Sequence, residues 1–593
     1  MRRRRTFGLA AFGAAAAITL AACSSGGSSS SSSGGGGGST SSSGYNAAIT
    51  GVVNPSSAKG GTINFGNSST PESLDPGNIY YAYEWNFSRL YTMPLMTYKS
   101  CPGQCGLQVV PDLATAPGQV SDNGLTWTYH IQPNVKFEDG TTVTSKDVKY
   151  AVERTFDRGL FPLGPAYFPG LLGGNAAKYP GPFKDKSSKD KMGLTAVDTP
   201  DATTIVFHLA KPFADFDYVA AIPQTAPVPP SKDTGANYQL HPISTGPYMV
   251  QSYQLNKQLI LVPNPNWNAS TDPNAKQLAS KIVETMNVNA NDIDNRLFAG
   301  DLQVDAAGTG VQAAGRAKLL STPSLKASAD DPLSGFTWFT AINTTLAPLN
   351  NVHCRMAVEY AANKTDYQNA YGGPVGGAIA STVSPTNVVG HQSFDLYGAT
   401  TNPNGDVTKA KSELQACGQP NGFSTGIAYR SDRPKEVATA QALQASLGQV
   451  GIKLSLHGFP TSTYSANFAG VPKYVAQHNI GLTLYGWAPD WPDGYGEFYY
   501  IVHGKAISPA GNTNQSQLND PAVNSLLDKM ATTNDATARN AFTGQIDMQV
   551  MKDAAILPGV YAKSLLYRSP SLTNVYVQPY YGMYNYAVLG VKS

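Results

Sequence analysis

Residues 486–500 read GWAPDWPDGYGEFYY and place two aspartates and a glutamate among two tryptophans, three tyrosines and a phenylalanine. Two neighbouring acids, Asp490 and Asp493, could serve as the paired carboxylates of a glycosidase. A single carboxylate such as Asp490 could instead pair the positive charge of a bound ligand, or it could form a turn or cap a helix. Trp487 and Trp491 suit the flat walls of a ligand pocket, and they suit a packed core as well.

Catalytic motifs elsewhere in the chain lack the context that their chemistry needs. GFSTG at 422–426 fits the G-x-S-x-G pattern, but a predicted helix precedes it and a predicted strand follows it, the reverse of a nucleophile elbow. There is no H-E-x-x-H, no P-loop and no G-x-G-x-x-G between a strand and a helix. The sequence therefore predicts a binding protein rather than an enzyme, without a cofactor.

Metal binding is not indicated by the histidines or by the remaining cysteines. Four cysteines follow the N-terminal region, and an even number outside the cell suggests disulfides. The turn CPGQC makes Cys101 and Cys105 a natural local pair, which leaves Cys354 and Cys417 for each other. A zinc half-site at C-x₃-C is the alternative, but no second Cys/His pair has metal spacing. The histidines that form no cluster are His241, His353, His391, His457, His478 and His503.

The N-terminus predicts export. Residues 2–5 are arginines, an apolar run too short for a stable membrane span follows, and small residues precede Cys23. Residues 20–23 read LAAC and resemble a bacterial lipobox, which implies that residues 1–22 are a signal peptide and that Cys23 carries lipid. A plain secretory signal is the alternative, and RRTFGL at 4–9 also resembles a twin-arginine signal. We expect a lipid-anchored protein on the extracellular face of the cell membrane.

A Ser/Gly-rich run follows Cys23, and the predicted tether spans residues 23–59. Such a segment has no side chains to bury and stays a flexible coil. The rest of the chain is long enough for two or three domains. Without the four signal arginines, the basic residues fall from 42 to 38 against 40 acidic ones. Nucleic acid is not an expected partner, because its binding needs a basic face.

Hydrophobic periodicity predicts a mixed α/β chain. LTWTYHI at 125–131 alternates with period two, and Thr144 or Ser145 can cap a helix that follows. The segment 244–267 reads as two strands around a polar turn, and a later helix ends at Gly300. Between residues 407 and 459 the predicted order is helix, strand, helix, strand, which favours parallel strands.

Further candidate ligand contacts lie at the ends of predicted strands. IYYAYEW at 79–85 follows the first strand and offers three tyrosines. Trp338 lies within a predicted strand, and Arg430 follows the strand GIAYR, where it could meet a ligand carboxylate. The tyrosines are Tyr80, Tyr81 and Tyr83.

Several segments together resemble the extracellular solute-binding proteins of family 5, the peptide/nickel class that serves ABC importers. They are LDP at 74–76, the long stretch from VVPDLA to YAVER at 109–154, STGPYMV at 244–250, AGDLQVDAAG at 299–308 and HCRMAVEYAANK at 353–364. The resemblance implies an α/β fold of two periplasmic-binding-protein-like lobes (type II, cluster C), with an extra subdomain inserted in lobe I.

The resemblance also implies domain boundaries and a hinge. Lobe I is expected at 60–335, with its inserted subdomain at about 95–240, and lobe II at 336–555. Residues 556–593 are expected to return to lobe I. The lobes of such a receptor close on the ligand, so binding shifts an open–closed equilibrium.

The function implied is capture of oligopeptides in the cleft between the lobes and delivery to the permease of an ABC importer. In peptide-binding members, an Asp in a G-W-x-x-D segment pairs the peptide's ammonium, and GWAPD at 486–490 places Asp490 there. A different solute, such as a sugar or a metal chelate, is the first alternative. A cell-surface hydrolase that uses Asp490 and Asp493 is the second. We expect a monomer.

Overall fold

The computed structural model describes residues 43–592 of the 593-residue chain. The predicted signal peptide, Cys23 and the Ser/Gly run up to residue 42 lie outside the described residues. Within residues 43–592, no helix is both long enough and apolar enough to cross a membrane.

Ordered packing begins before residue 60, where the predicted tether ends. Helix α1 (Ala47–Thr50) buries Ala48 completely, and Val53 forms a β-bridge with Val575. The backbone N–H of Ala48 donates to Asp330 at 2.9 Å. The predicted tether is therefore too long at its C-terminal end, because YNAAITGVV carries apolar side chains that the Ser/Gly run lacks.

The first sheet has five strands in the order β11-β1-β10-β9-β8. β1 pairs in parallel with β10 and β11, whereas β8, β9 and β10 are antiparallel neighbours. The hairpin predicted at 244–267 is thus confirmed, and α6 (Ala290–Ala299) ends at Gly300 with a left-handed φ of 90°, as predicted. The strands are β1 (Thr62–Gly66), β8 (Tyr248–Gln254), β9 (Gln258–Pro263), β10 (Lys281–Thr285) and β11 (Val304–Asp305).

A second, antiparallel sheet has four strands in the order β4-β5-β7-β6. Beside it lies α3 (Ser145–Arg154), which begins with a capping box between Thr144 and Asp147. The strands are β4 (Gln119–Ser121), β5 (Thr126–His130), β6 (Val197–Asp201) and β7 (Thr204–His208).

The third sheet has six strands in the order β14-β18-β13-β17-β15-β16. β15 runs parallel to β16, as predicted for residues 407–459, and it also runs parallel to β17. β13 is antiparallel to β17 and β18. The strands are β13 (Leu333–Ile342), β14 (Gly377–Ile379), β15 (Ser424–Arg430), β16 (Lys453–Phe459), β17 (Ile480–Trp487) and β18 (Ile556–Lys563). β18 belongs to this sheet although it begins after residue 555, so the sheet extends beyond the predicted lobe II boundary.

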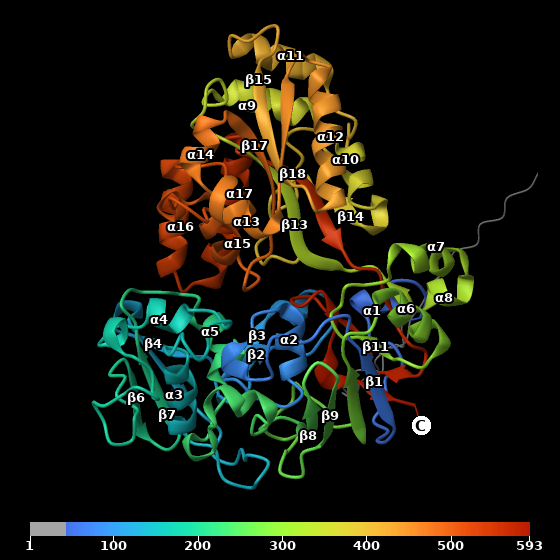
Figure 1. Cartoon of the computed structure of the whole chain (residues 1–593). Helices are drawn as coiled ribbons and strands as arrows, with labels where there is room; N and C mark the ends of the chain where they lie inside the picture. The colour runs from blue at the N-terminus through green and yellow to red at the C-terminus, as the bar shows by residue number, and fades with distance from the viewer. Residues whose placement is uncertain (1–42, 593) are drawn as a thin grey trace, which may run out of the picture. The chain divides into compact units, whose positions relative to one another are not determined.

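Helices pack on both faces of the six-stranded sheet (Figure 1). Period-two alternation in β13 explains this, since Phe339 and Ala341 join one apolar cluster and Ile342 joins another. The first cluster includes residues of α15 (Gly494–Val502), α16 (Pro521–Thr532) and α17 (Ala536–Lys552), and the second includes residues of α9 (Val352–Ala361), α11 (Val407–Ala416) and α12 (Pro434–Gly448).

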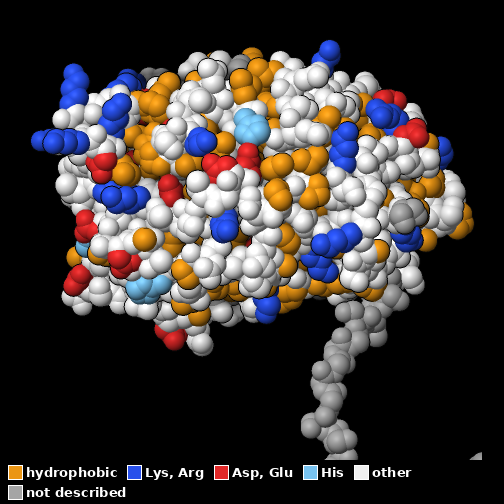
Figure 2. Space-filling model, turned by 90° about the horizontal axis from the view of Figure 1, so that it is seen from below, with side chains coloured by type: hydrophobic (Ala, Val, Ile, Leu, Met, Phe, Trp, Pro, Cys, Tyr) orange, Lys and Arg blue, Asp and Glu red, His pale blue; other side chains and the backbone are white. Residues whose placement is uncertain are grey.

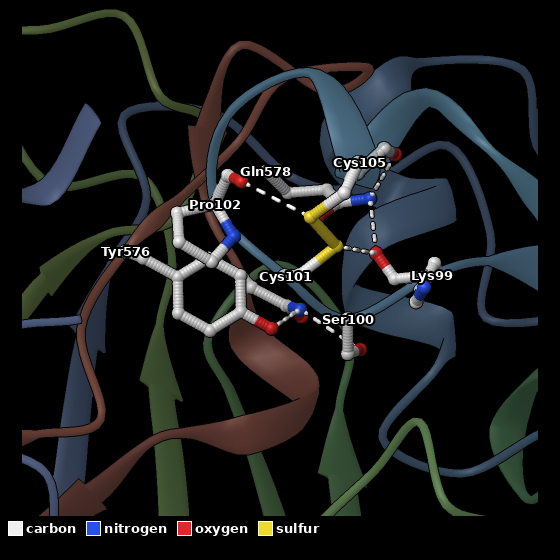
Figure 3. Close-up of a disulfide and its surroundings, with 9 residues drawn as sticks. Lys99, Ser100, Cys101, Pro102, Cys105, Tyr576 and Gln578 are labelled. Carbon is white, nitrogen blue, oxygen red and sulfur yellow. Dashed lines mark hydrogen bonds between the residues drawn. A yellow bond between two sulfur atoms is a disulfide. The ribbon is translucent and has the colours of Figure 1, made fainter. Parts of the chain in front are cut away.

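Two disulfides are present. Cys101 and Cys105 are joined within a turn beside Tyr576 and Gln578 (Figure 3). Cys354 and Cys417 join α9 to α11 across 63 positions of sequence. These are the two pairs that the cysteine spacing indicates.

The charge balance of the sequence is visible on the surface. On the face shown in Figure 2, Lys and Arg side chains are interspersed with Asp and Glu, and they form no continuous basic stripe there. This face lacks the basic footprint typical of nucleic-acid binding.

Candidate functional site

A cavity of about 440 Å³ brings together three residues that the sequence singled out as ligand contacts: Tyr80, Trp487 and Asp490. Its volume lies in the range of about 300–1,000 Å³ that is usual for small-molecule sites. Its lining consists of Tyr80, Arg158, Leu163, Gly164, Pro165, Ala166, Tyr167, Trp487, Asp490, Tyr500 and Thr513. The cavities beside Asp294 and beside Arg89 hold about 10 Å³ each, room for a single water molecule.

Asp490 follows β17 and provides the only carboxylate of this cavity. The phenols of Tyr80, at 2.8 Å, and Tyr167 both donate to its Oδ2. No side chain or backbone group of residues 43–592 donates to its Oδ1. Burial raises the pKa of this carboxyl to about 6. The carboxylate is therefore oriented on one oxygen and open to a donor on the other.

Trp487 and Trp491 lie in different environments. Trp487, at the end of β17, lines the cavity, and its Nε1 donates to the carbonyl of Gly496 at 3.2 Å. Trp491 is only 2% exposed and belongs to the apolar core. Its Nε1 donates to Asp215 at 2.9 Å, and its ring contacts Tyr167 edge-on. Trp491 thus supports the cavity wall from behind, as the core-packing alternative expects.

Asp493 does not face the cavity. Its side chain caps α15 by accepting the N–H of Gly496 at 2.9 Å, and it forms an ion pair with Arg539. The same guanidinium pairs with Asp215. Asp490 and Asp493 therefore do not line one cavity together, which removes the geometric basis for a paired-acid hydrolase.

Tyr81 and Tyr83 stack on each other beside the cavity and do not line it. Tyr81 is 56% exposed, whereas Tyr83 is half-buried against a smaller cavity near Glu284. The carboxylate of Glu84 accepts the backbone N–H groups of Tyr80 and Tyr81, both at 3.3 Å. Burial raises the pKa of Glu84 to about 7.

Trp338 and Arg430 lie together, and neither is among the lining residues of the cavity. The Arg430 guanidinium is 5.5 Å from the Trp338 ring centroid, and its Nε donates to Glu436 at 2.9 Å. The ring of Tyr371 packs against the ring of Trp338, with the centroids 5.5 Å apart. Since Glu436 already pairs Arg430, this arginine is not an open anion site in the structure.

Besides Tyr500 and Thr513, the lining residues that sequence reasoning missed lie between 158 and 167. They occupy a Pro/Gly-rich connection after α3, RGLFPLGPAY, whose only chemical signal was Arg158. Tyr167 begins the short helix α4 (Tyr167–Leu171) and reaches Asp490 across 323 positions of sequence. No local pattern could have indicated that contact.

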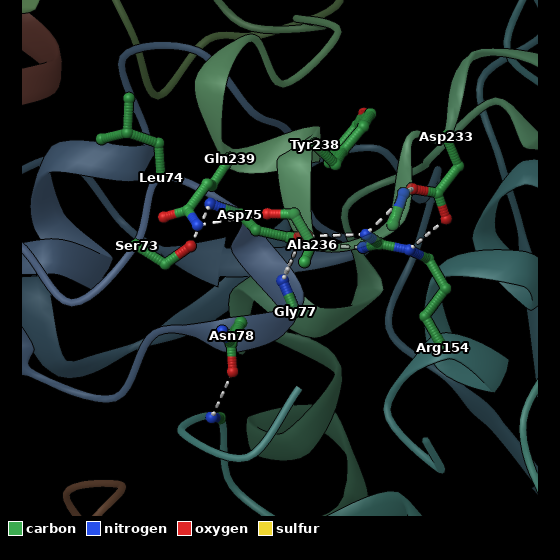
Figure 4. A network of polar contacts seen from close by, with 12 residues as sticks. Ser73, Leu74, Asp75, Gly77, Asn78, Arg154, Asp233, Ala236, Tyr238 and Gln239 are labelled. Atoms are coloured by element: carbon green, nitrogen blue, oxygen red, sulfur yellow. Dashed lines mark hydrogen bonds and ion pairs between the residues drawn. The ribbon is translucent and has the colours of Figure 1, made fainter. Parts of the chain in front are cut away.

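A buried ionic network lies beside the two loops that carry Tyr80 and residues 163–167 of the cavity (Figure 4). The Arg154 guanidinium donates to both carboxylate oxygens of Asp75, at 2.9 and 2.6 Å, and its Nε donates to Asp233 at 2.8 Å. Three residues beyond Asp75, the side chain of Asn78 accepts the backbone N–H of Leu163 at 2.9 Å. The loop that carries Tyr80 is thereby fixed to the loop that carries Leu163–Tyr167.

Sequence comparisons point to one family. A family model described as bacterial extracellular solute-binding proteins, family 5 (middle), matches residues 108–509. The probable D,D-dipeptide-binding periplasmic protein DdpA of Escherichia coli K12 is 27% identical over 504 residues, 83% of this chain and 86% of that protein. The glutathione-binding protein GsiB of Shigella flexneri is 23% identical over 476 residues, 78% of this chain and 82% of that protein.

Solved structures agree. The clavulanic acid biosynthesis oligopeptide binding protein 2 is 38% identical, with a TM-score of 0.87 over 93% of this chain and 99% of that chain. The periplasmic binding protein DppA from Helicobacter pylori, solved in complex with the peptide STSA, is 20% identical, with a TM-score of 0.61 over 89% and 98%. The predicted two-lobe α/β fold class is confirmed. The chain belongs to the bacterial extracellular solute-binding proteins, family 5.

Proposed function

We propose that this protein captures short peptides and delivers them to the permease of an ABC importer, and that it catalyses no reaction. Family membership supports the role of extracellular solute receptor. The name of the 38% identical structure, an oligopeptide-binding protein, and the bound peptide of the DppA structure support a peptide ligand.

The observation that carries the proposal is the open Oδ1 of Asp490 in an aromatic-walled cavity. A peptide's α-ammonium loses its water when it enters such a cavity and needs a charged acceptor in return. A half-buried carboxylate provides a short, charge-assisted hydrogen bond. Tyr80 and Tyr167 hold the carboxylate in place, and Trp487 provides a flat wall for varied side chains.

The positions of the lining residues in the chain support closure of the receptor on its ligand. Tyr80 and residues 158–167 belong to the first part of the chain, whereas Trp487 and Asp490 follow a strand of the six-stranded sheet. A peptide that contacts both sets stabilises the arrangement in which they meet, so binding shifts the population toward it.

The N-terminal features complete the proposal. A lipid on Cys23 and the Ser/Gly run would keep the receptor close to the membrane, beside its permease, as a monomer. This part rests on the sequence alone, since these residues lie outside the described range.

A sugar or a metal chelate is the alternative ligand. Among residues 43–592, no group of three or more His, Cys, Asp or Glu side chains is arranged to hold a metal ion. The paired-acid hydrolase is disfavoured because Asp493 is occupied by Arg539 and by the cap of α15.

The deciding experiment is mass spectrometry of the ligand that co-purifies with the native protein, under non-denaturing and then denaturing conditions. We expect short peptides, released intact. Recovery of an oligosaccharide or a chelate would overturn the peptide assignment. Release of cleaved products during incubation of the purified protein with the recovered ligand would overturn the assignment as a non-enzymatic receptor.

A further inference from the structure

Arg158 is the second charged residue that lines the cavity, the first being Asp490. It is exposed, and two of its N–H groups donate to the carbonyls of Gly164, at 2.8 Å, and Pro162, at 2.6 Å. None of the ion pairs within residues 43–592 includes Arg158. A guanidinium has further N–H donors beyond these two, so it keeps the capacity to bind an anion.

The charges of the lining are therefore one carboxylate and one guanidinium. All other lining side chains are neutral: three tyrosines, a tryptophan, a threonine and small or aliphatic residues. Resting on the proposed function, we infer that the cavity selects ligands with two opposite charges, an ammonium at Asp490 and a carboxylate at Arg158. The assigned ligand class is a short peptide that carries a free carboxylate.

The position of Arg158 supports an anion-binding role over a purely structural one. It follows α3 by four residues, and that helix ends in Arg154, which is fixed by Asp75 and Asp233. The carbonyls that Arg158 contacts belong to the loop held by Asn78. The guanidinium is thus held by neutral carbonyls, which orient it without cancelling its charge. A planar guanidinium in a fixed orientation suits a carboxylate, which it can bind through two parallel hydrogen bonds.

Two exposed apolar residues of the lining add a preference for ligands with apolar side chains. Tyr500 and Leu163 are 39% and 41% exposed, and both line the cavity. Exposed apolar groups at the mouth of a cavity gain from contact with an apolar ligand. The volume of about 440 Å³ lies in the range usual for small ligands, which suits a short peptide.

The test uses isothermal titration with alanyl di-, tri- and tetrapeptides, each as the free acid and as the C-terminal amide. We expect the wild-type protein to bind at least one free acid about tenfold or more tightly than its amide, the size expected for a charge-assisted contact. Arg158→Gln should abolish this preference by weakening the free acid and leaving the amide unchanged. Arg158→Lys should restore part of it.

Arg296→Gln is the matched control, because Arg296 lies on α6, outside the cavity lining. It should leave the affinities of both forms unchanged. An amidated peptide with an internal glutamate distinguishes the source of the carboxylate. Tight, Arg158-dependent binding of that amide assigns the site to an acidic side chain, and its weak binding assigns the site to the C-terminus.

Equal affinities of acid and amide for the wild-type protein would overturn the inference without any variant, so a folding defect cannot hide the answer. In that case, sensitivity of the affinity to Asp490→Asn would leave the proposed peptide function standing. If no peptide binds in either form, the proposed function itself is wrong.

Discussion

The Tyr80 phenol donates a hydrogen bond to the Asp490 carboxylate at 2.8 Å, although 410 positions separate the two residues. Tyr80 follows the first strand of the five-stranded sheet, and Asp490 follows β17 of the six-stranded sheet. One hydrogen bond at the ligand cavity thus connects segments that follow strands of two different sheet layers. The orientation of the proposed ammonium acceptor depends on both layers.

We expect the affinity for peptides with a free ammonium to rise with pH through the titration of Asp490. Burial raises the pKa of this carboxyl from 3.8 to about 6. The neutral acid that prevails below that pH is a poor partner for a cation, so affinity should increase about tenfold between pH 5 and pH 7. The same shift costs the unliganded protein stability as pH rises from 3.8 to about 6. Isothermal titration and thermal unfolding at both pH values measure the two effects.

Asp490→Asn should remove the pH step and weaken binding at pH 7 by about tenfold or more. Asp301→Asn, an exposed carboxyl just after α6, should change neither. A pH profile that persists in Asp490→Asn would show that another group titrates on binding.

Strands and helix ends were predictable where residues close together in the sequence determine them. Strand β5 lies within the alternating segment LTWTYHI, and β15 ends with the predicted strand GIAYR. Gly300 ends α6 because its φ of 90° suits a residue without Cβ. These features depend on neighbours within a few positions, which the sequence displays directly.

The environment of each cavity residue was less predictable, because it depends on distant segments. Trp487 and Trp491 look equivalent in GWAPDW, but Trp487 lines the cavity, whereas Trp491 is buried and donates to Asp215, 276 positions away. The position of Arg430 at the end of its strand suggested an anion site, yet its guanidinium donates to the carboxylate of Glu436. Arg158 was hidden in a connection without periodicity. Residue type indicated the chemistry, and tertiary contacts decided which groups stay open.

Gly164 is expected to be essential to the shape of the cavity. A Cβ at this position would lie 2.3 Å from the carbonyl oxygen of Gly77, which is backbone and cannot rotate away. Gly164→Ala should therefore displace the loop, destabilise the protein by about 1–3 kcal/mol and weaken peptide binding. Urea unfolding and isothermal titration measure the two losses.

Gly170→Ala, six positions further along the chain, is the matched control, because a Cβ there meets no atom within 4 Å. It lies within α4, where alanine is the better helix former, so stability should be equal or slightly higher. Wild-type affinity in Gly164→Ala would mean that this loop does not shape the ligand site.

The two disulfides should differ in what they contribute to stability. Removing the Cys354–Cys417 bond by double alanine substitution releases a loop of 63 positions, for which chain entropy predicts a loss of about 4 kcal/mol. The Cys101–Cys105 bond closes only 4 positions, for which the same relation predicts about 2 kcal/mol. Urea unfolding of the two double variants compares them directly. The reverse order would mean that native packing, rather than loop length, determines the contribution.

The ion cluster behind the cavity should be important for folding stability. Arg539 pairs with Asp215 and Asp493, and all three side chains are buried. Arg539→Met leaves two carboxylates buried without a counter-charge, which should reduce the free energy of unfolding by about 3–5 kcal/mol. Asn at both acid positions preserves the hydrogen bonds to Trp491 and to the α15 cap without a charge, so the triple variant should recover most of the loss. Urea unfolding followed by tryptophan fluorescence measures both variants. A triple variant no more stable than Arg539→Met would show that the arginine acts through packing instead of charge.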